Sequence, residues 1–220
     1  MFPYTSAGPI VRYTDIETQL KQRTINIFKF GIGAELFVKG LAKKVLLADN
    51  LSVLYSSICG HPQMSVFTSW LGILAYTMQL YFDFSGYSDM AIGLGKMLGF
   101  DFNKNFDYPY ISTSVSEFWR RWHISLGSWF RDYIYIPLGG NRVSTLKHIR
   151  NILVVWALTG LWHGASWNFV LWGVYYGLFL LLEKFVLQKY LKKIPSWLCT
   201  VYTMLVAVSY THLRAHETPE

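Results

Sequence analysis

An unusually long charge-free stretch limits how this chain can fold. Residues 152–182 contain no Asp, Glu, Lys or Arg, and water-soluble helices seldom lack charges over such a length. As one straight helix, residues 152–183 would measure about 48 Å, against a bilayer hydrocarbon core of about 30 Å. The segment therefore has to bend or break, and the glycines and serine of 160–166, around His163, mark the expected break.

The positive charges stand at the ends of the apolar stretches. The composition is 52% hydrophobic and 15% charged with a net charge of +7, and the Lys and Arg residues form groups at 43–44, 120–121, 142–150 and 184–193. This placement is typical of cytoplasmic membrane flanks and disfavours a nucleic-acid partner. If 152–183 is a hairpin, both of its ends are cytoplasmic and His163 lies about 18 Å inside; a tilted pair of other orientation fits the same pattern.

The remaining segments also favour helices. Residues 25–50 mix apolar and basic side chains like an interfacial helix, and 65–82 form the first expected span, continuing toward Gly99. Ser114 and Glu117 form a capping box for a helix to about Phe130, whose arginines and histidine favour a re-entrant or interior position. We expect an all-α, multi-pass transmembrane protein with re-entrant and interfacial helices.

The main part of the sequence and its last residues lead to different expectations. Residues 1–208 are interpreted as a partial membrane domain that begins in mid-protein, without a signal peptide. Residues 209–220 resemble a translated sequencing-library adapter, the alternative being an ordinary polar tail, so His212 and His216 receive no functional weight. Cys59 and Cys199 indicate neither a disulfide framework nor a zinc site.

Two histidines are candidates for chemistry. An imidazole inside a membrane is costly unless it meets protein, water or substrate, so His163 suggests function, although a hydrogen bond to a neighbouring helix would also explain it. His123 follows Arg120 and Arg121 on the aromatic segment, where a plain interfacial position is the stronger alternative.

A polar group interrupts the apolar segment after residue 80. Asp83 and Asp89 accompany Ser85 and Tyr87, and buried carboxylates need partners. They are expected to bind a cation, orient a histidine or, as the favoured interpretation, pair with Arg120, Arg121 or Arg131. Gly93, Gly95 and Gly99 are interpreted as helix-packing positions. No G-x-S-x-G, P-loop or H-E-x-x-H motif occurs, which argues against hydrolase, ATPase and zinc-protease functions.

Five ordered motifs carry a resemblance to a known family. They lie at residues 7–13 (AGPIVRY), 79–93 (QLYFDFSGYSDMAIG), 118–126 (FWRRWHISL), 129–140 (WFRDYIYIPLGG) and 161–164 (LWHG). In order and spacing the chain resembles the MBOAT family of membrane-bound O-acyltransferases, in particular its alginate O-acetylation and D-alanyl-transfer branch. The family's essential histidine corresponds to His163 and its second histidine to His123.

The resemblance implies transfer of an acyl group, of which acetyl is the expected one, across a bacterial plasma membrane. The donor would be acetyl-CoA or an acyl-carrier thioester, with neither a metal nor a bound cofactor, and the acceptor a hydroxyl of an extracytoplasmic polysaccharide such as alginate. An extracytoplasmic acetyltransferase partner and a cytoplasmic acyl carrier are implied beside the lipid bilayer. The wall of the substrate tunnel is assigned to Asp83, Ser85, Tyr87, Trp162, Arg120 and Arg121.

Two other interpretations stay open from the residues alone. A membrane transport or export component of a polysaccharide system would also place ionisable groups inside the bilayer. A chain covering only part of the family's length would alternatively be an inactive fragment.

Overall fold

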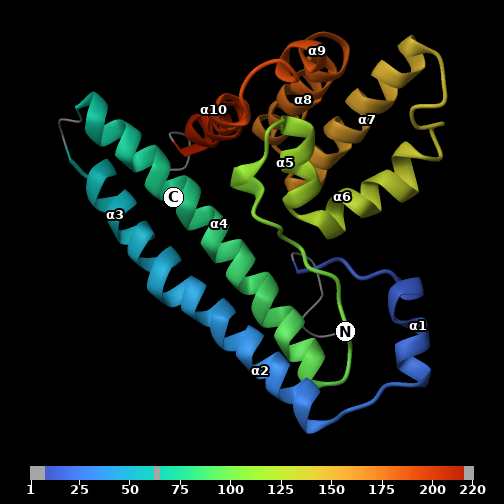
Figure 1. Cartoon of the computed structure of the whole chain (residues 1–220). Helices are drawn as coiled ribbons and strands as arrows, with labels where there is room; N and C mark the ends of the chain where they lie inside the picture. The colour runs from blue at the N-terminus through green and yellow to red at the C-terminus, as the bar shows by residue number, and fades with distance from the viewer. Residues whose placement is uncertain (1–7, 62–64, 216–220) are drawn as a thin grey trace. The chain divides into compact units, whose positions relative to one another are not determined.

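The computed structural model describes residues 8–61 and 65–215, with side chains through Ser209. All regular structure in this part of the chain is helical, and the chain divides into two compact units, Met1–Phe106 and Asp107–Glu220 (Figure 1). Ala7 and His216, both named above, lie outside the described residues, as does the side chain of His212.

Each unit is a set of helices. The first contains α1 (Tyr13–Lys21), α2 (Ile27–Ala42), η1 (Lys43–Ala48), α3 (Asp49–Cys59) and α4 (Val66–Met97). The second contains η2 (Pro109–Ile111), α5 (Val115–Arg121), α6 (Ile124–Phe130), η3 (Arg131–Tyr135), α7 (Thr145–His163), α8 (Trp167–Leu182), η4 (Glu183–Leu187), α9 (Gln188–Leu191) and α10 (Ser196–Ala215).

In the first unit, the helical run α2–η1–α3 packs along α4 (Figure 1). The Asn26 side chain caps α2 by accepting a hydrogen bond from Lys29 N at 2.7 Å, and the Ser65 hydroxyl caps α4 by accepting one from Thr68 N at 3.2 Å. The helix expected at 25–50 is confirmed but continues to Cys59, because the first helix-ending residue after it is Gly60.

Two glycine pairs bring α2 and α4 into backbone contact. A Cβ on Gly40 would lie 2.5 Å from the carbonyl oxygen of Gly86, and one on Gly33 would lie 2.7 Å from that of Gly93. The pairs are seven residues apart in both helices, or two turns, so they fall on one face of each. Any side chain at these positions would push the helices apart, which confirms the packing role predicted for Gly93.

The carboxylates of α4 pair with lysines. The Lys43 ammonium lies 2.6 Å from a carboxylate oxygen of Asp89, and that of Lys44 lies 2.9 Å from one of Asp83. Structural pairing is thus confirmed, but the arginine partners expected from the sequence were wrong, because the α2–α4 contact places the lysines of η1 beside these carboxylates.

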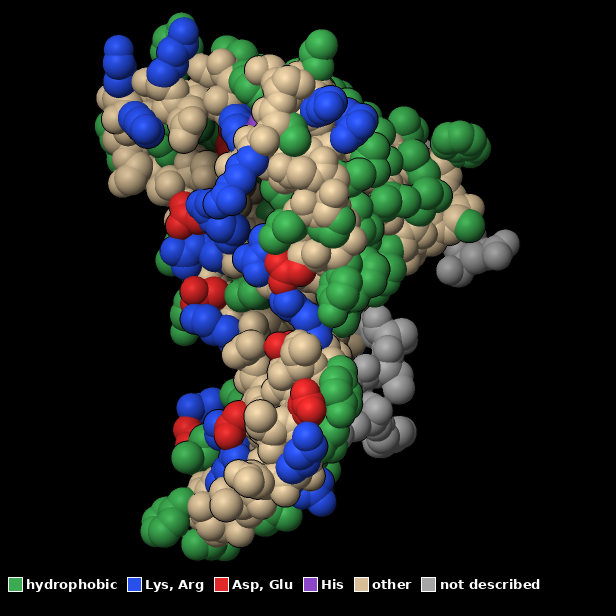
Figure 2. All heavy atoms as spheres, turned by 90° about the vertical axis from the view of Figure 1, so that its right-hand side faces the viewer, with side chains coloured by type: hydrophobic (Ala, Val, Ile, Leu, Met, Phe, Trp, Pro, Cys, Tyr) green, Lys and Arg blue, Asp and Glu red, His purple; other side chains and the backbone are tan. Residues whose placement is uncertain are grey.

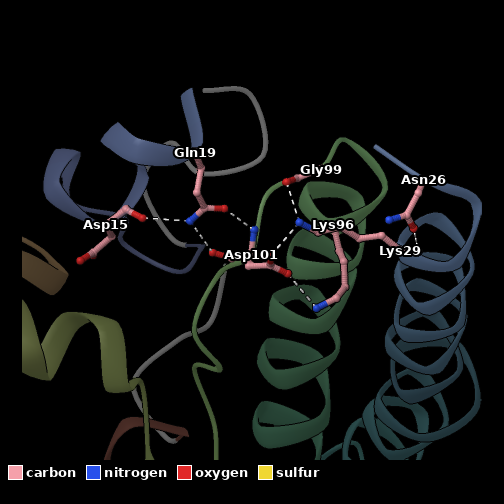
Figure 3. Close-up of polar contacts among 7 residues, drawn as sticks. All are labelled: Asp15, Gln19, Asn26, Lys29, Lys96, Gly99 and Asp101. Atoms are coloured by element: carbon pink, nitrogen blue, oxygen red, sulfur yellow. Dashed lines mark hydrogen bonds and ion pairs between the residues drawn. The ribbon is translucent and has the colours of Figure 1, made fainter. Parts of the chain in front are cut away.

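Polar contacts around Asp101 fix this helix pair at the end where α2 begins and α4 ends (Figure 3). Its carboxylate lies 2.6 Å from the Lys29 ammonium and 3.0 Å from that of Lys96. The Lys29 ammonium also donates to the carbonyl of Gly99 at 2.8 Å, and the Gln19 side chain exchanges two hydrogen bonds with the Asp101 backbone. These contacts join α1, α2 and the end of α4.

The second unit contains the expected hairpin. α7 ends at His163 and α8 begins at Trp167, so the break predicted at 160–166 is confirmed. The helices touch through Gly160, whose Cβ would collide with the carbonyl of Phe169, and through Gly173, whose Cβ would collide with that of Trp156. Glycine therefore permits the contact on both sides of the hairpin.

The open end of the hairpin is basic. Lys184 Nζ lies 3.1 Å from His148 Nε2, so the two basic flanks of the charge-free stretch lie together. Figure 2 shows Lys and Arg side chains at the upper edge of the molecule, where α7 begins and α9 ends. In the two basic flanks, the exposed cations are Arg142, Lys147, Arg150, Lys184, Lys189, Lys192 and Lys193.

One helix in the described part of the chain has the length and apolarity to cross a membrane. It runs from Trp167 to Leu191, through α8, η4 and α9, with a mean hydropathy of 1.6. The span expected at 65–82 is a helix of sufficient length, but by the same measure it is too polar. Its tyrosines, threonines, serine and Gln79 lower its mean hydropathy despite the absence of charge.

The glycine contact in the first unit gives a test with a matched control. Gly86→Ala should lower the thermal midpoint of the whole protein in detergent, because overpacking typically costs about 1–3 kcal/mol. Gly31→Ala should leave it unchanged or raise it, since a Cβ there meets nothing within 4 Å and alanine favours helix. Equal effects at the two positions would contradict the close packing of α2 on α4.

The contacts of Asp101 predict a pH dependence. The Lys29 ammonium, with help from Lys96, holds the pKa of the Asp101 carboxyl below its usual range. A depressed folded-state pKa stabilises the fold above the unfolded-state pKa, and this stabilisation is lost as pH falls through the folded value.

The effect should be small, because the Asp101 side chain is 57% exposed and exposed pairs contribute about 0.2–1 kcal/mol each. Thermal midpoints of wild type and Asp101→Asn should differ at pH 7 and converge in acid. A constant difference across the pH range would contradict the role of the ionised carboxylate.

Candidate active site

The second unit contains a cavity of about 490 Å³ that both candidate histidines line. His163 reaches it from the end of α7, and His123 from the junction of α5 and α6. Aromatic and apolar side chains form most of the wall, with two cationic side chains, Arg120 and Arg131. A mostly apolar cavity with a few polar groups is the usual form of a small-molecule site.

His163 is held by its own helix. Its Nδ1 lies 2.8 Å from the carbonyl oxygen of Thr159, and because a carbonyl only accepts, Nδ1 carries the hydrogen. In the neutral ring the basic lone pair is therefore on Nε2. The ring centroid lies 4.8 Å from that of Trp172 and 6.1 Å from that of Phe169, both on α8, so the start of α8 fixes the orientation of the imidazole.

His123 stands at a helix break that the sequence did not predict. One helix was expected from 114 to about 130, but α5 ends at Arg121, Trp122 is extended, and His123 has φ 45°. This left-handed conformation is uncommon for residues other than glycine and costs on the order of 1–3 kcal/mol, so it persists only where the surrounding structure enforces it. His123 is 4% exposed. From this break its side chain lines the cavity.

The predicted start of α5 is confirmed in part. The Ser114 hydroxyl accepts a hydrogen bond from Glu117 N at 3.0 Å. The Glu117 carboxylate does not return to Ser114 but accepts from Thr113 N at 2.9 Å. It also pairs with Arg121 at 2.9 Å.

Tryptophans pack behind the two histidines. The ring of Trp119 lies 4.8 Å from that of Trp156, 5.4 Å from that of Trp172 and 4.7 Å from that of Tyr176. All three tryptophans line the cavity. Because α5, α7 and α8 each contribute one, this cluster fixes the three helices around the site.

The other residues predicted for the tunnel wall differ in whether they line the cavity. Arg120 lines the cavity, whereas Arg121 is engaged by Glu117 and by the carbonyl of Asp107 at 3.0 Å and is not part of the lining. Trp162 is not part of the lining either, but its ring lies 5.0 Å from that of His163 and 6.1 Å from that of His123.

Asp83, Ser85 and Tyr87 lie on α4 in the other unit. Ser85 is buried, Asp83 pairs with Lys44, and Tyr87 is exposed. Their place in a tunnel wall stays a prediction.

The sequence did not indicate some residues that line the cavity or that are buried elsewhere in this unit. Trp119, Trp172 and Arg131 line the cavity, yet apolar periodicity cannot tell an aromatic cavity wall from an ordinary core. His148 is buried, with Nε2 2.9 Å from the Tyr135 hydroxyl. Its position within a basic cluster, next to Lys147, was the only available signal.

Comparison with known proteins shows the family of the chain. Residues 1–213 match the MBOAT, membrane-bound O-acyltransferase family. The chain belongs to this family. The described helices and the family's membrane location together confirm the all-α, multi-pass membrane fold class.

Individual relatives support the branch inferred from the motifs. The chain is 51% identical to the "Probable alginate O-acetylase AlgI" of Azotobacter vinelandii over 84% of its own length and 37% of the relative's. It is 39% identical to the "Peptidoglycan O-acetyltransferase" of Helicobacter pylori, over 90% and 40%. It is 28% identical to the "Teichoic acid D-alanyltransferase" of Bacillus subtilis, over 96% and 56%. The chain thus spans about two fifths to about half of these relatives.

The left-handed backbone at His123 can be separated from its imidazole. His123→Gly should fold in the whole protein, because glycine accepts positive φ, whereas His123→Val should lower the yield of folded protein and its thermal midpoint, because a β-branched residue does not. Size-exclusion profiles in detergent give both readouts. Equal stability of the two variants would argue against the helix break.

Proposed function

We propose that the protein of which this chain is a part is an O-acyltransferase, which uses His163 to move an acyl group, acetyl in our proposal, from a cytoplasmic thioester to a hydroxyl of an extracytoplasmic polysaccharide. The observation that carries the proposal is that His123 and His163, 40 residues apart in sequence, line one cavity. The membrane-bound acyltransferase family supports the same reaction class.

In this proposal one nitrogen of His163 carries out the proton transfer. With Nδ1 donating to Thr159, Nε2 of neutral His163 takes the proton of the acceptor hydroxyl while its oxygen attacks the thioester carbonyl. The new C–O bond forms, the C–S bond breaks, and the imidazolium returns the proton to the departing thiolate. General-base catalysis of this kind contributes typically about 10²- to 10⁴-fold.

The other wall groups have supporting roles in this proposal. His123 lies beside Trp162, which also contacts His163, so it binds or orients the acceptor or the thioester. Arg120 and Arg131 are the cations of the wall and stabilise negative charge developing on the thioester oxygen. No metal or bound cofactor is needed for these steps.

Acceptor, partner and location follow the relatives' names. These name alginate, peptidoglycan and teichoic acid, so the proposed acceptor is a bacterial envelope polymer, with alginate first because the alginate relative has the highest identity of the three. We place the whole protein in the bacterial plasma membrane. An extracytoplasmic acetyltransferase is its proposed partner, and acetyl-CoA or an acyl-carrier thioester its donor.

Loss of His163 should abolish acylation. In cells carrying the whole gene, His163→Ala should reduce the ester content of the exported polysaccharide by at least about 100-fold, because the general base is lost, while polymer export continues. The measurement is ester per sugar at matched levels of membrane protein. His61→Ala, at an exposed turn of the other unit, is the matched control and should acylate like wild type.

Two results would contradict the proposal. Unchanged acylation in His163→Ala would return this residue to a packing role. Loss of polymer export together with ester would favour a transport component, which requires no acyl donor.

A further inference from the structure

A buried glutamate connects the two histidine-bearing segments without lying in the cavity. Glu183 follows α8 inside the apolar span and is 4% exposed. Placing a carboxylate in such a position costs several kcal/mol unless its oxygens are fully bonded. Its partners therefore indicate why it is there.

The hydrogen bonds that fix the Glu183 carboxylate come from the start of α5, and the Tyr202 side chain of α10 interacts with the same carboxylate. One carboxylate oxygen accepts from Val115 N at 2.6 Å, and the other accepts from Ser116 N and the Ser116 hydroxyl, each at 3.0 Å. These amides are among the helix N–H groups that lack an intrahelical acceptor. The carboxylate satisfies them and also meets the positive end of the helix dipole.

This contact is the first of a series along α5. Val115 N meets Glu183, and one turn later the ring of Trp119 packs against Tyr176 and Trp172 of α8. About another turn along the chain comes His123, in the cavity wall that also includes His163. The α5 segment thus runs antiparallel to α8, from Glu183 toward the hairpin turn that bears His163.

Ring contacts alone do not fix the register of such a pairing. An aromatic helix can slide by one turn, about 5.4 Å, and still find aromatic partners. The carboxylate opposes such a slip, because the slip would take the three α5 donors away from it while it stays buried, at a cost of several kcal/mol. A slip would also remove His123 from its place in the wall.

We infer that Glu183 is a positioning residue, which sets the register of α5 on α8 and thereby places His123 in the cavity opposite His163. The inference rests on the proposed acyl transfer. Glu183 itself takes no part in the chemistry and acts through His123.

The test uses the whole protein in membranes with a thioester donor. Glu183→Gln keeps the shape of the side chain but turns an amide NH₂ group toward an N–H donor. It should lower kcat by about 10- to 100-fold, the loss that an error of about 1 Å in catalytic geometry produces, with KM for the donor within about twofold. Glu35→Gln, at an exposed pair with Lys39, is the matched control and should leave both constants unchanged.

A double-mutant cycle separates positioning from general loss of structure. If Glu183 acts through His123, Glu183→Gln should reduce activity little further in a His123→Gln background, whereas independent effects would multiply. Glu183→Asp, which keeps the charge, should restore part of kcat. The cycle uses thermal midpoints as a folding control.

The outcomes are distinct. Unchanged kcat in Glu183→Gln, or effects that multiply with those of His123→Gln, would overturn the inference while leaving His163→Ala inactive. Activity retained in His163→Ala would instead overturn the proposed function. If Glu183→Gln does not fold, the cycle is measured with Glu183→Asp, and multiplying effects there overturn the inference.

Discussion

Backbone contact at glycine is the constraint on which both units depend. Gly33 and Gly40 lie against glycines of α4 in the first unit, and Gly160 and Gly173 lie against backbone carbonyls in the α7–α8 hairpin. In an apolar environment, burial of apolar surface drives helix association weakly, so close packing has to supply the energy. Larger residues would separate the helices and with them every side chain placed between them.

Once the helices lie this close, the polar groups between them have few possible partners. The lysines of η1 find the carboxylates of α4, and Glu183 finds the first amides of α5. The lysine pairs contribute little net stability, because their side chains are partly exposed. The Glu183 carboxylate is buried, so its effect is on geometry, since a shifted register would take its donors away.

The sequence predicted the elements whose signals are local. The Ser114 hydroxyl caps α5 as expected, and the charge-free stretch breaks at its glycines and serine. The break at His123 was missed because nothing local demands it. The segment reads as continuous helix, and tertiary packing around Trp122 and His123 overrides this preference. The lysine partners of Asp83 and Asp89 were missed for a related reason, because they depend on how α2 meets α4.

The candidate site was also predicted only in part. His163 was singled out because an imidazole in an apolar segment is costly, and His123 chiefly through the family resemblance; the structure brings both into one cavity wall. The tryptophan cluster was not predictable, because its residues have the same period as a plain core. The left-handed backbone explains why these two histidines meet. A straight helix would carry the chain on past the hairpin turn, whereas the turn at His123 ends α5 near Trp162, which contacts both imidazoles. The strain at this residue and the buried carboxylate at the opposite end of α5 are therefore two parts of one arrangement that holds a second imidazole next to the first.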